Sequence, residues 1–217
     1  MGFTEELRNW NYEQRCQAAV KALEKNRFTA LYCANKEAAI DYILKEAAEA
    51  GTIGFGGSRT VADLGIQDQL AAMGKVLHDH NNPGLINLEE KIKVMRRQLT
   101  SDLFLASANA LTLSGNIINV DGNGNRVAAM IFGPKKVILV VGRNKLVDGV
   151  DEGIKRIKAY AAPLAAKRLN IDVPCAKTGF CMDCNSPGRV CTITVILERK
   201  PRLSDIRVLV VNEEMGF

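Results

Sequence analysis

The stretch FTALYCANKEAAIDYILKEAAEAGTIGFGGSRT, residues 28–60, decides the fold class. Residues 28–34 form a short apolar run typical of a buried strand, and residues 38–50 have the pattern of a helix that Asn35 can cap. A second apolar run, residues 52–55, leads into a glycine-rich loop. Strand, helix and strand in this order are typical of a parallel βαβ unit with a right-handed crossover. We therefore predict an α/β fold with a parallel-sheet core.

The same alternation continues along the chain. Residues 76–80 have the pattern of a strand and residues 85–101 that of a helix. Beyond residue 102 strand-like runs dominate, and DGNGN at residues 121–125 lies between two of them, NIINV and RVAAMI. Asn and Gly tolerate positive φ, so this pentapeptide predicts a β-hairpin.

The C-terminal part combines one helix with two further strands. A helix is expected from about residue 150 to residue 169, divided or kinked at Pro163. Apolar strands are expected at residues 192–198 and 205–213. The sequence has no linker, internal repeat or low-complexity tract. We therefore expect one domain over residues 1–217, with the cysteine-rich loop 174–191 as an internal excursion.

Composition excludes several classes of function. The formal net charge is +5, and the basic residues are scattered at helical positions without interleaved aromatic side chains. This pattern argues against nucleic-acid binding and is compatible with a small anionic metabolite as partner. No apolar run reaches membrane-spanning length, so no membrane insertion is expected. The first residues lack the apolar run of a signal peptide, so we expect a cytoplasmic protein.

The glycine loop is the first candidate ligand site. Gly56 and Gly57 permit close approach of a ligand to the backbone, Ser58 and Thr60 supply hydroxyls, and Arg59 supplies a positive charge. A helix starting there would present unpaired amides to an anion at the carboxyl edge of a parallel sheet. The loop has neither the Gly-Lys-Ser/Thr ending of an NTPase loop nor the G-x-G-x-x-G spacing, and no flavin or nicotinamide motif is present. A purely structural glycine turn is the alternative.

Polar residues near two strand ends form the second candidate group. Ser107, Asn109 and Arg126 are ligand candidates because turn geometry does not demand these residue types. His78 and His80 could chelate a metal ion, but no acidic cluster at a recognisable spacing accompanies them. For the two histidines we expect an exposed strand end.

The run PCAKTGFCMDCNSPGRVC, residues 174–191, holds four of the six cysteines. These candidate metal ligands are Cys175, Cys181, Cys184 and Cys191. Thiolates are soft ligands, and the C-x5-C-x2-C-x6-C spacing can surround one iron–sulfur cluster or one zinc ion. Reduced or disulfide-bonded thiols and an active CxxC dithiol are the alternatives; a reducing cytosol favours metal binding. Cys16 and Cys33 lie in apolar settings and are expected in the core.

Together, these segments resemble one protein family. GFGGSRTVADLGI, SANALTLSGNIINVDGNGNR, the PCxxxGxCxDCxSPxRxC run and VLVVNEEMGF are similar to the corresponding segments of the LUD, or lactate-utilization, domain family over residues 4–217. The resemblance implies a fold similar to sugar-phosphate isomerases and class I CoA transferases, with a ligand crevice near the glycine loop. It also implies participation in the oxidation of L-lactate to pyruvate beside separate iron–sulfur oxidoreductase subunits.

Two functional hypotheses follow. In the first, the chain is an accessory redox or iron–sulfur component of organic-acid oxidation, and its four cysteines hold a cluster. In the second, it is an isomerase-like or transferase-like enzyme that binds a small anion or a CoA ester, with zinc or no metal at the thiols. Because the chain lacks a flavin or nicotinamide motif, a hydride acceptor would have to come from elsewhere.

Overall fold

The computed structural model describes residues 2–217, and its centre is a six-stranded sheet in which every neighbouring pair is parallel. In spatial order the strands are β1 (Thr29–Cys33), β10 (Asp205–Val211), β7 (Lys136–Gly142), β4 (Leu103–Ala106), β2 (Thr52–Phe55) and β3 (Val76–Asp79). The parallel α/β prediction is therefore confirmed. In β7, Val137 and Leu139 pack on one face while Ile138 and Val140 pack on the other, as expected for a strand covered on both sides.

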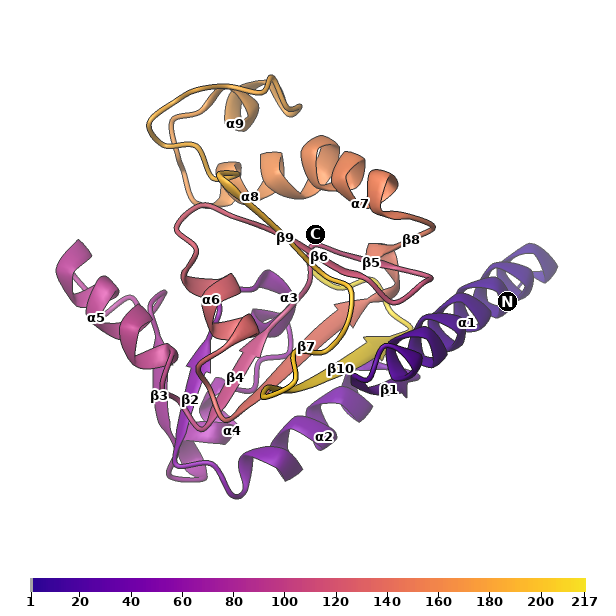
Figure 1. Cartoon of the computed structure of the whole chain (residues 1–217), viewed down its shortest axis with the longest axis horizontal. Coiled ribbons are helices and arrows are strands. Elements are labelled where there is room, and N and C mark those ends of the chain that lie inside the picture. Colours follow the sequence, from indigo (N-terminus) through magenta and orange to yellow (C-terminus); the bar gives the residue numbers. More distant parts are fainter. Residues whose placement is uncertain (1) are drawn as a thin grey trace.

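A second, four-stranded sheet lies over one face of the first. Its strands are, in spatial order, β8 (Leu146–Val147), β5 (Ala110–Thr112), β6 (Ile117–Asp121) and β9 (Ile193–Leu197). β5 and β6 are antiparallel, as are β6 and β9, whereas β5 and β8 are parallel. Figure 1 shows α7 and α8 above this second sheet, on the side away from α2.

Helices cover both layers. They are α1 (Phe3–Lys25), α2 (Lys36–Ala47), α3 (Arg59–Ala62), α4 (Gln67–Ala72), α5 (Leu88–Gln98), α6 (Asn125–Ile131), α7 (Val150–Arg156), α8 (Ala162–Arg168) and α9 (Pro174–Thr178), with a 3-10 turn η1 (Arg143–Lys145) and a π-helical turn η2 (Ile157–Ala161). Asn35 caps α2 as predicted, since its side chain accepts a hydrogen bond from the backbone N–H of Ala38. Pro163 is the second residue of α8, directly after the π-turn, so a π-helical turn interrupts the expected long helix next to this residue.

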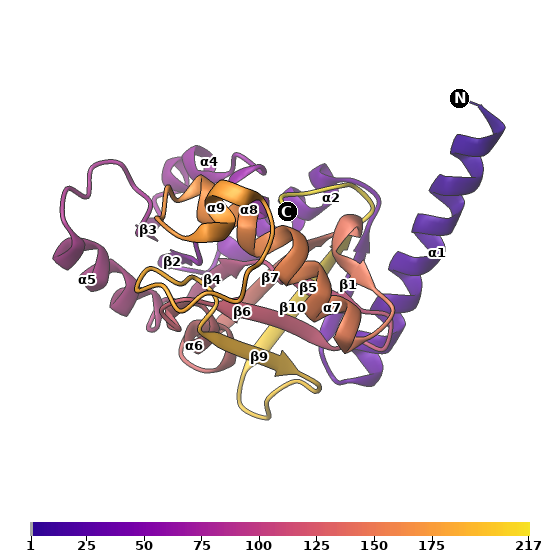
Figure 2. The same cartoon turned by 90° about the horizontal axis from the view of Figure 1, so that it is seen from above.

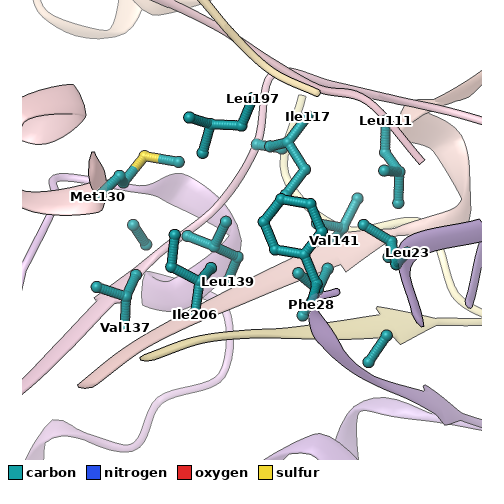
Figure 3. Packing of buried hydrophobic residues seen from close by; sticks show 14 of the residues in the cluster. Leu23, Phe28, Leu111, Ile117, Met130, Val137, Leu139, Val141, Leu197 and Ile206 are labelled. Atoms are coloured by element: carbon teal, nitrogen blue, oxygen red, sulfur yellow. The ribbon is translucent and has the colours of Figure 1, made fainter. Parts of the chain in front are cut away.

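The hydrophobic core has three parts. The largest lies between the two sheets, where Phe28, Ile117 and Leu139 pack together (Figure 3). A second part lies between the first sheet and helices α2, α3 and α4, and a third lies between the second sheet and the α7–η2 segment. Cys16 and Cys33 are buried at 0% and 4% exposure, which confirms that they are core residues. Figure 2 shows that the N-terminal part of α1 extends beyond this packed body.

The hairpin prediction at DGNGN is wrong in position. The residues after this turn form helix α6, and the hairpin joins β5 to β6 instead. The carboxylate of Asp121 accepts a hydrogen bond from the backbone N–H of Val127, so it stabilises the first turn of α6. Gly124, at φ 80°, directs the chain into the helix. The same Asn, Asp and Gly residues suit a hairpin turn and a helix start, and the alanines that follow favour the helix.

Among residues 2–217, no helix combines the length and the apolar character needed to cross a membrane.

Candidate functional site

A cavity of about 410 Å³ opens at the carboxyl edge of the first sheet. Four segments that follow strands contribute to its wall: Gly56 after β2, His80 after β3, Ser107 after β4 and Lys145 after β7. β2 and β4 are neighbours in this sheet. The next strand of the sheet after β2 is β3, which lies on one side of the pair, whereas the next after β4 is β7, which lies on the other side. Open α/β sheets bind ligands at such a reversal of strand order. The predicted glycine loop therefore lies where a ligand site is expected.

Within the glycine loop, glycine is needed at positions 56 and 57 for different structural reasons. A Cβ at Gly56 would lie 3.0 Å from the ring of Phe104 and 3.2 Å from Cγ of Arg126, so glycine is required for packing. Gly57 has φ 69°, in the left-handed region, and a Cβ there would lie 3.0 Å from Nε2 of His80. Gly57 therefore lets the loop pass close to the histidine.

The three polar residues of the loop point in different directions. The Ser58 hydroxyl accepts a hydrogen bond from the backbone N–H of Val61 at 3.3 Å, capping α3. Arg59 is 56% exposed and forms an ion pair with Asp63 at 2.6 Å. Thr60 is buried and accepts a hydrogen bond from Lys145. Because α3 spans only Arg59–Ala62, it is too short to provide the helix N-terminus that the sequence suggested as an anion site.

Lys145 is the cavity residue that sequence reasoning missed. It is 3% exposed, and its Nζ donates to Oγ1 of Thr60 at 2.7 Å and to Oγ of Ser107 at 3.0 Å. Burial, together with the guanidinium groups of Arg156 and Arg126, lowers the pKa of Lys145 from 10.5 to about 7. Near neutral pH this amine therefore exists in both protonation states. It lies in the η1 turn that follows β7, but nothing in the sequence signals its burial.

Arg126 holds the wall of the cavity together. Its Nη1 donates to the backbone carbonyl of Ser107 at 3.0 Å and to Oδ1 of Asn119 at 2.8 Å. Its Nη2 donates to Oδ1 of Asn109 at 3.0 Å and to the carbonyl of Val120 at 2.8 Å. Since these four bonds use all the hydrogens of both terminal nitrogens, Arg126 provides positive charge and rigidity to the site but no free donor from these atoms.

Ser107 and Asn109, both predicted site residues, lie beside Lys145 and Arg126 in the same wall. The Ser107 hydroxyl donates to the carbonyl of Ala108 at 3.2 Å while it accepts from Lys145. Oδ1 of Asn109 accepts from Arg126 and from the backbone N–H of Val120, so its amide nitrogen is the part that can serve a ligand. The structure thus brings the glycine loop, Ser107, Asn109 and Arg126, which the sequence offered as two candidate groups, into one cavity wall.

His80 also belongs to the cavity wall, so the expectation of an exposed strand end is wrong for this residue. Nε2 of Gln98 donates to the carbonyls of Phe55 at 2.8 Å and His78 at 2.9 Å, and it lies 2.9 Å from Nδ1 of His80. An amide nitrogen cannot accept a hydrogen bond, so Nδ1 of His80 accepts a share of one of the two amide hydrogens, and in the neutral ring Nε2 carries the proton. Burial lowers the pKa of His80, which favours this neutral form.

The cavity is strongly basic. Its lining includes one carboxylate, Asp121, and five basic side chains: Arg59, Arg126, Lys145, Arg168 and Arg189. Arg168 donates to the carbonyl of Gly57 at 3.2 Å and lies over the ring of Phe217. A site with this excess of positive charge in a partly enclosed space attracts anions.

The cysteine run forms α9 and the loop that follows it, and all four thiols are free and partly buried. The backbone N–H of Asp183 donates to Sγ of Cys181 at 3.4 Å, and a backbone hydrogen bond from Ser186 lowers the pKa of Cys184. Burial and then the charges of the other three thiols raise the pKa of Cys175, so the four sulfurs lie within electrostatic range of one another. Within residues 2–217, no three His, Cys, Asp or Glu side chains are arranged to hold a metal ion. The metal site stays a prediction.

Arg189 joins the cysteine loop to the cavity. It donates to the backbone carbonyl of Cys191 at 2.9 Å, to the side chain of Asp183 at 2.9 Å and to the carbonyl of Cys184. Residues 187–190, between the last two cysteines, contribute to the cavity wall. The loop is therefore part of the site.

Comparisons with known proteins gave two similar solved structures and one matching family. A DUF162 family protein from Deinococcus radiodurans, solved by crystallography, is 14% identical with a TM-score of 0.50, and the match covers 94% of this chain and 98% of that one. The alpha subunit of a malonate decarboxylase from Acinetobacter baumannii is 17% identical with a TM-score of 0.30, over 87% of this chain and 25% of that one. No curated protein matches the chain. The model of the LUD domain matches residues 16–211, and the chain therefore belongs to the LUD domain family.

Proposed function

We propose that the cavity binds the anion of a small organic acid and that Lys145 exchanges a proton with it. One observation carries this proposal: a buried amine with a pKa of about 7 lies between two hydroxyls in a cavity whose charged side chains are mostly cationic. A group whose pKa is close to the working pH is the most effective general acid or base. The remaining basic side chains supply the field that holds the carboxylate or phosphate.

The family supports an organic acid as the substrate, because its name refers to lactate utilization. We infer that the chain acts in organic-acid oxidation, with L-lactate to pyruvate as one such reaction. Oxidation of a hydroxy acid removes the hydroxyl proton and a hydride from the carbon. Lys145 in its neutral form would accept the hydroxyl proton. A flavin or nicotinamide group on a partner subunit would accept the hydride, and iron–sulfur centres of that partner would then carry the two electrons onward.

An isomerase-like or transferase-like enzyme is the alternative. Proton transfer by Lys145, with the neutral imidazole of His80 as a hydrogen-bond donor on another part of the wall, needs no electron acceptor. Such a site would act on a small anion or a CoA ester.

A second candidate function concerns the cysteine loop, for which we propose an iron–sulfur cluster or, as the alternative, zinc. The N–H···S bond from Asp183 to Cys181 within the C-x2-C unit supports it, because such bonds stabilise thiolates bound to metals. All four thiols belong to one short segment, residues 175–191, and the charges of the other three contribute to raising the pKa of Cys175. If bound, the cluster would supply one-electron transfer beside the cavity wall.

Anion binding is tested by calorimetric titration with inorganic phosphate, L-lactate and pyruvate. We expect Lys145→Met to weaken binding by roughly tenfold to a hundredfold, the usual effect of losing a hydrogen bond to a charged group. Binding to the wild type should also weaken as the pH rises through 7, because Lys145 then loses its charge. The matched control is Lys158→Met, since Lys158 is exposed and does not line the cavity. Equal affinities in both variants, or no binding of any of these anions by the wild type, would contradict the proposal.

The metal hypothesis is tested on protein purified under strictly anaerobic conditions. We expect iron with acid-labile sulfide, or zinc, in the wild type, and loss of the metal in Cys181→Ser because one ligand is missing. Asn185→Ser, in the same loop but without a thiol, should keep the metal. Wild-type protein without iron, sulfide or zinc would exclude a metal role for the loop.

A further inference from the structure

One part of the cavity wall is mainly apolar. Besides Arg168, the segment from η2 through α8 to Leu169 contributes five apolar residues to the lining: Ile157, Ala161, Ala162, Ala165 and Leu169. These positions are spaced as one face of a helix, so the alanines form a continuous strip. Ile157 and Ala161 are 2% exposed, and Ala162 and Ala165 are partly buried beside the open space. Methyl groups leave room along this strip where larger side chains would fill it.

The polar wall and the alanine strip differ in what they can recognise. Lys145 and Asn109 present donors, and Lys145 also positive charge, at the strand ends. The alanine strip offers neither, and it gains free energy only when apolar ligand surface covers it. A ligand that used the whole site would therefore be charged at one end and apolar at the other.

The volume of the cavity also indicates a ligand larger than lactate. Cavities of about 300–1,000 Å³ enclose drug-sized ligands. At about 410 Å³ this one is far larger than a three-carbon acid such as lactate requires. Lactate bound at Lys145 would leave the alanine strip in contact with water, and that surface would contribute nothing to its affinity.

We propose that the cavity takes an organic acid with an apolar chain or ring of several carbons, with the carboxylate end at Lys145 and the tail along Ala161, Ala162 and Ala165. This inference rests on the proposed function, because both place the anionic head at Lys145. It adds the preferred substrate class: a medium-chain or aromatic hydroxy or oxo acid, which binds more tightly than lactate.

The test is a calorimetric titration of the full chain with a homologous series from L-lactate through 2-hydroxyhexanoate to 2-hydroxyoctanoate, together with phenyllactate. Each methylene that becomes buried on the strip should raise the affinity about fourfold. Ala165→Phe should abolish this gain and leave the affinity for lactate unchanged, because it fills only the tail region. Ala159→Phe, at an exposed position of η2 outside the cavity, is the matched control and should behave as the wild type.

The possible outcomes separate this inference from the proposed function. If lactate binds and longer acids bind no better, the tail site is wrong while anion binding stands. If none of the acids binds, both are wrong. The titrations of the wild type with acids of increasing length test the tail site by themselves, so the inference can be contradicted even if Ala165→Phe does not fold. If Ala165→Phe folds and still favours the long acids, the tail does not lie on the alanine strip.

Discussion

Between pH 7 and pH 10 the wild-type protein is expected to gain stability over the Lys145→Met variant by up to about 1.4 kcal/mol for each pH unit. In the folded chain, burial and then the charges of Arg156 and Arg126 lower the pKa of Lys145 from 10.5 to about 7. Within this window the unfolded chain binds a proton that the folded chain has released. The free energy of unfolding therefore rises with pH, whereas below pH 7 both states carry the charge and the dependence disappears.

Urea unfolding at half-unit steps from about pH 6 to about pH 10, in buffers without phosphate, measures this dependence. Lys158→Met is the control, because it removes an exposed lysine that lies outside the cavity. A wild-type curve that stays parallel to that of Lys145→Met would show that the amine keeps its ordinary pKa. The same series with saturating phosphate links the effect to binding. A phosphate anion bound at Lys145 favours the charged form of the amine, so the rise in the free energy of unfolding should begin at a higher pH.

The sequence predicts the scaffold of the site better than its chemistry. The βαβ pattern of residues 28–60 and the position of Gly57 after a strand depend on local periodicity, and both are found in the structure. Ser107 and Asn109 could be identified because no turn requires them. Their meeting with the glycine loop follows from parallel topology, since carboxyl ends of neighbouring strands share one edge.

Residues whose role depends on burial could not be predicted in this way. Lys145 is one of many basic residues in the sequence, and only the packing around it lowers its pKa. His80 enters the site because Gln98, from a distant helix, fixes its ring. The error at DGNGN has a local cause, since its residues suit two kinds of turn. The alanines that follow favour the helix, and Met130 of that helix packs in the core.

Arg126→Met is expected to destabilise the fold by about 3–5 kcal/mol, the usual effect of breaking a buried charged network by removing one member. Arg126 is 13% exposed and donates four hydrogen bonds, two of them to backbone carbonyls. Methionine matches much of its volume but leaves the carbonyls of Ser107 and Val120 and the side chains of Asn109 and Asn119 without this donor. The carboxylate of Asp121 would also lose its nearest positive charge, 3.9 Å away.

The matched control for this effect is Arg59→Met, which removes a guanidinium from the same cavity at a position that is 56% exposed. Its surface ion pair with Asp63 contributes at most about 1 kcal/mol, so urea unfolding should separate the two variants clearly. Arg126→Lys should remain strongly destabilised, because one ammonium cannot reach four acceptors in different directions. If Arg126→Met and Arg59→Met lost the same small amount, the network would not hold the wall together, and Arg126 would be a ligand-binding residue as its sequence position first suggested.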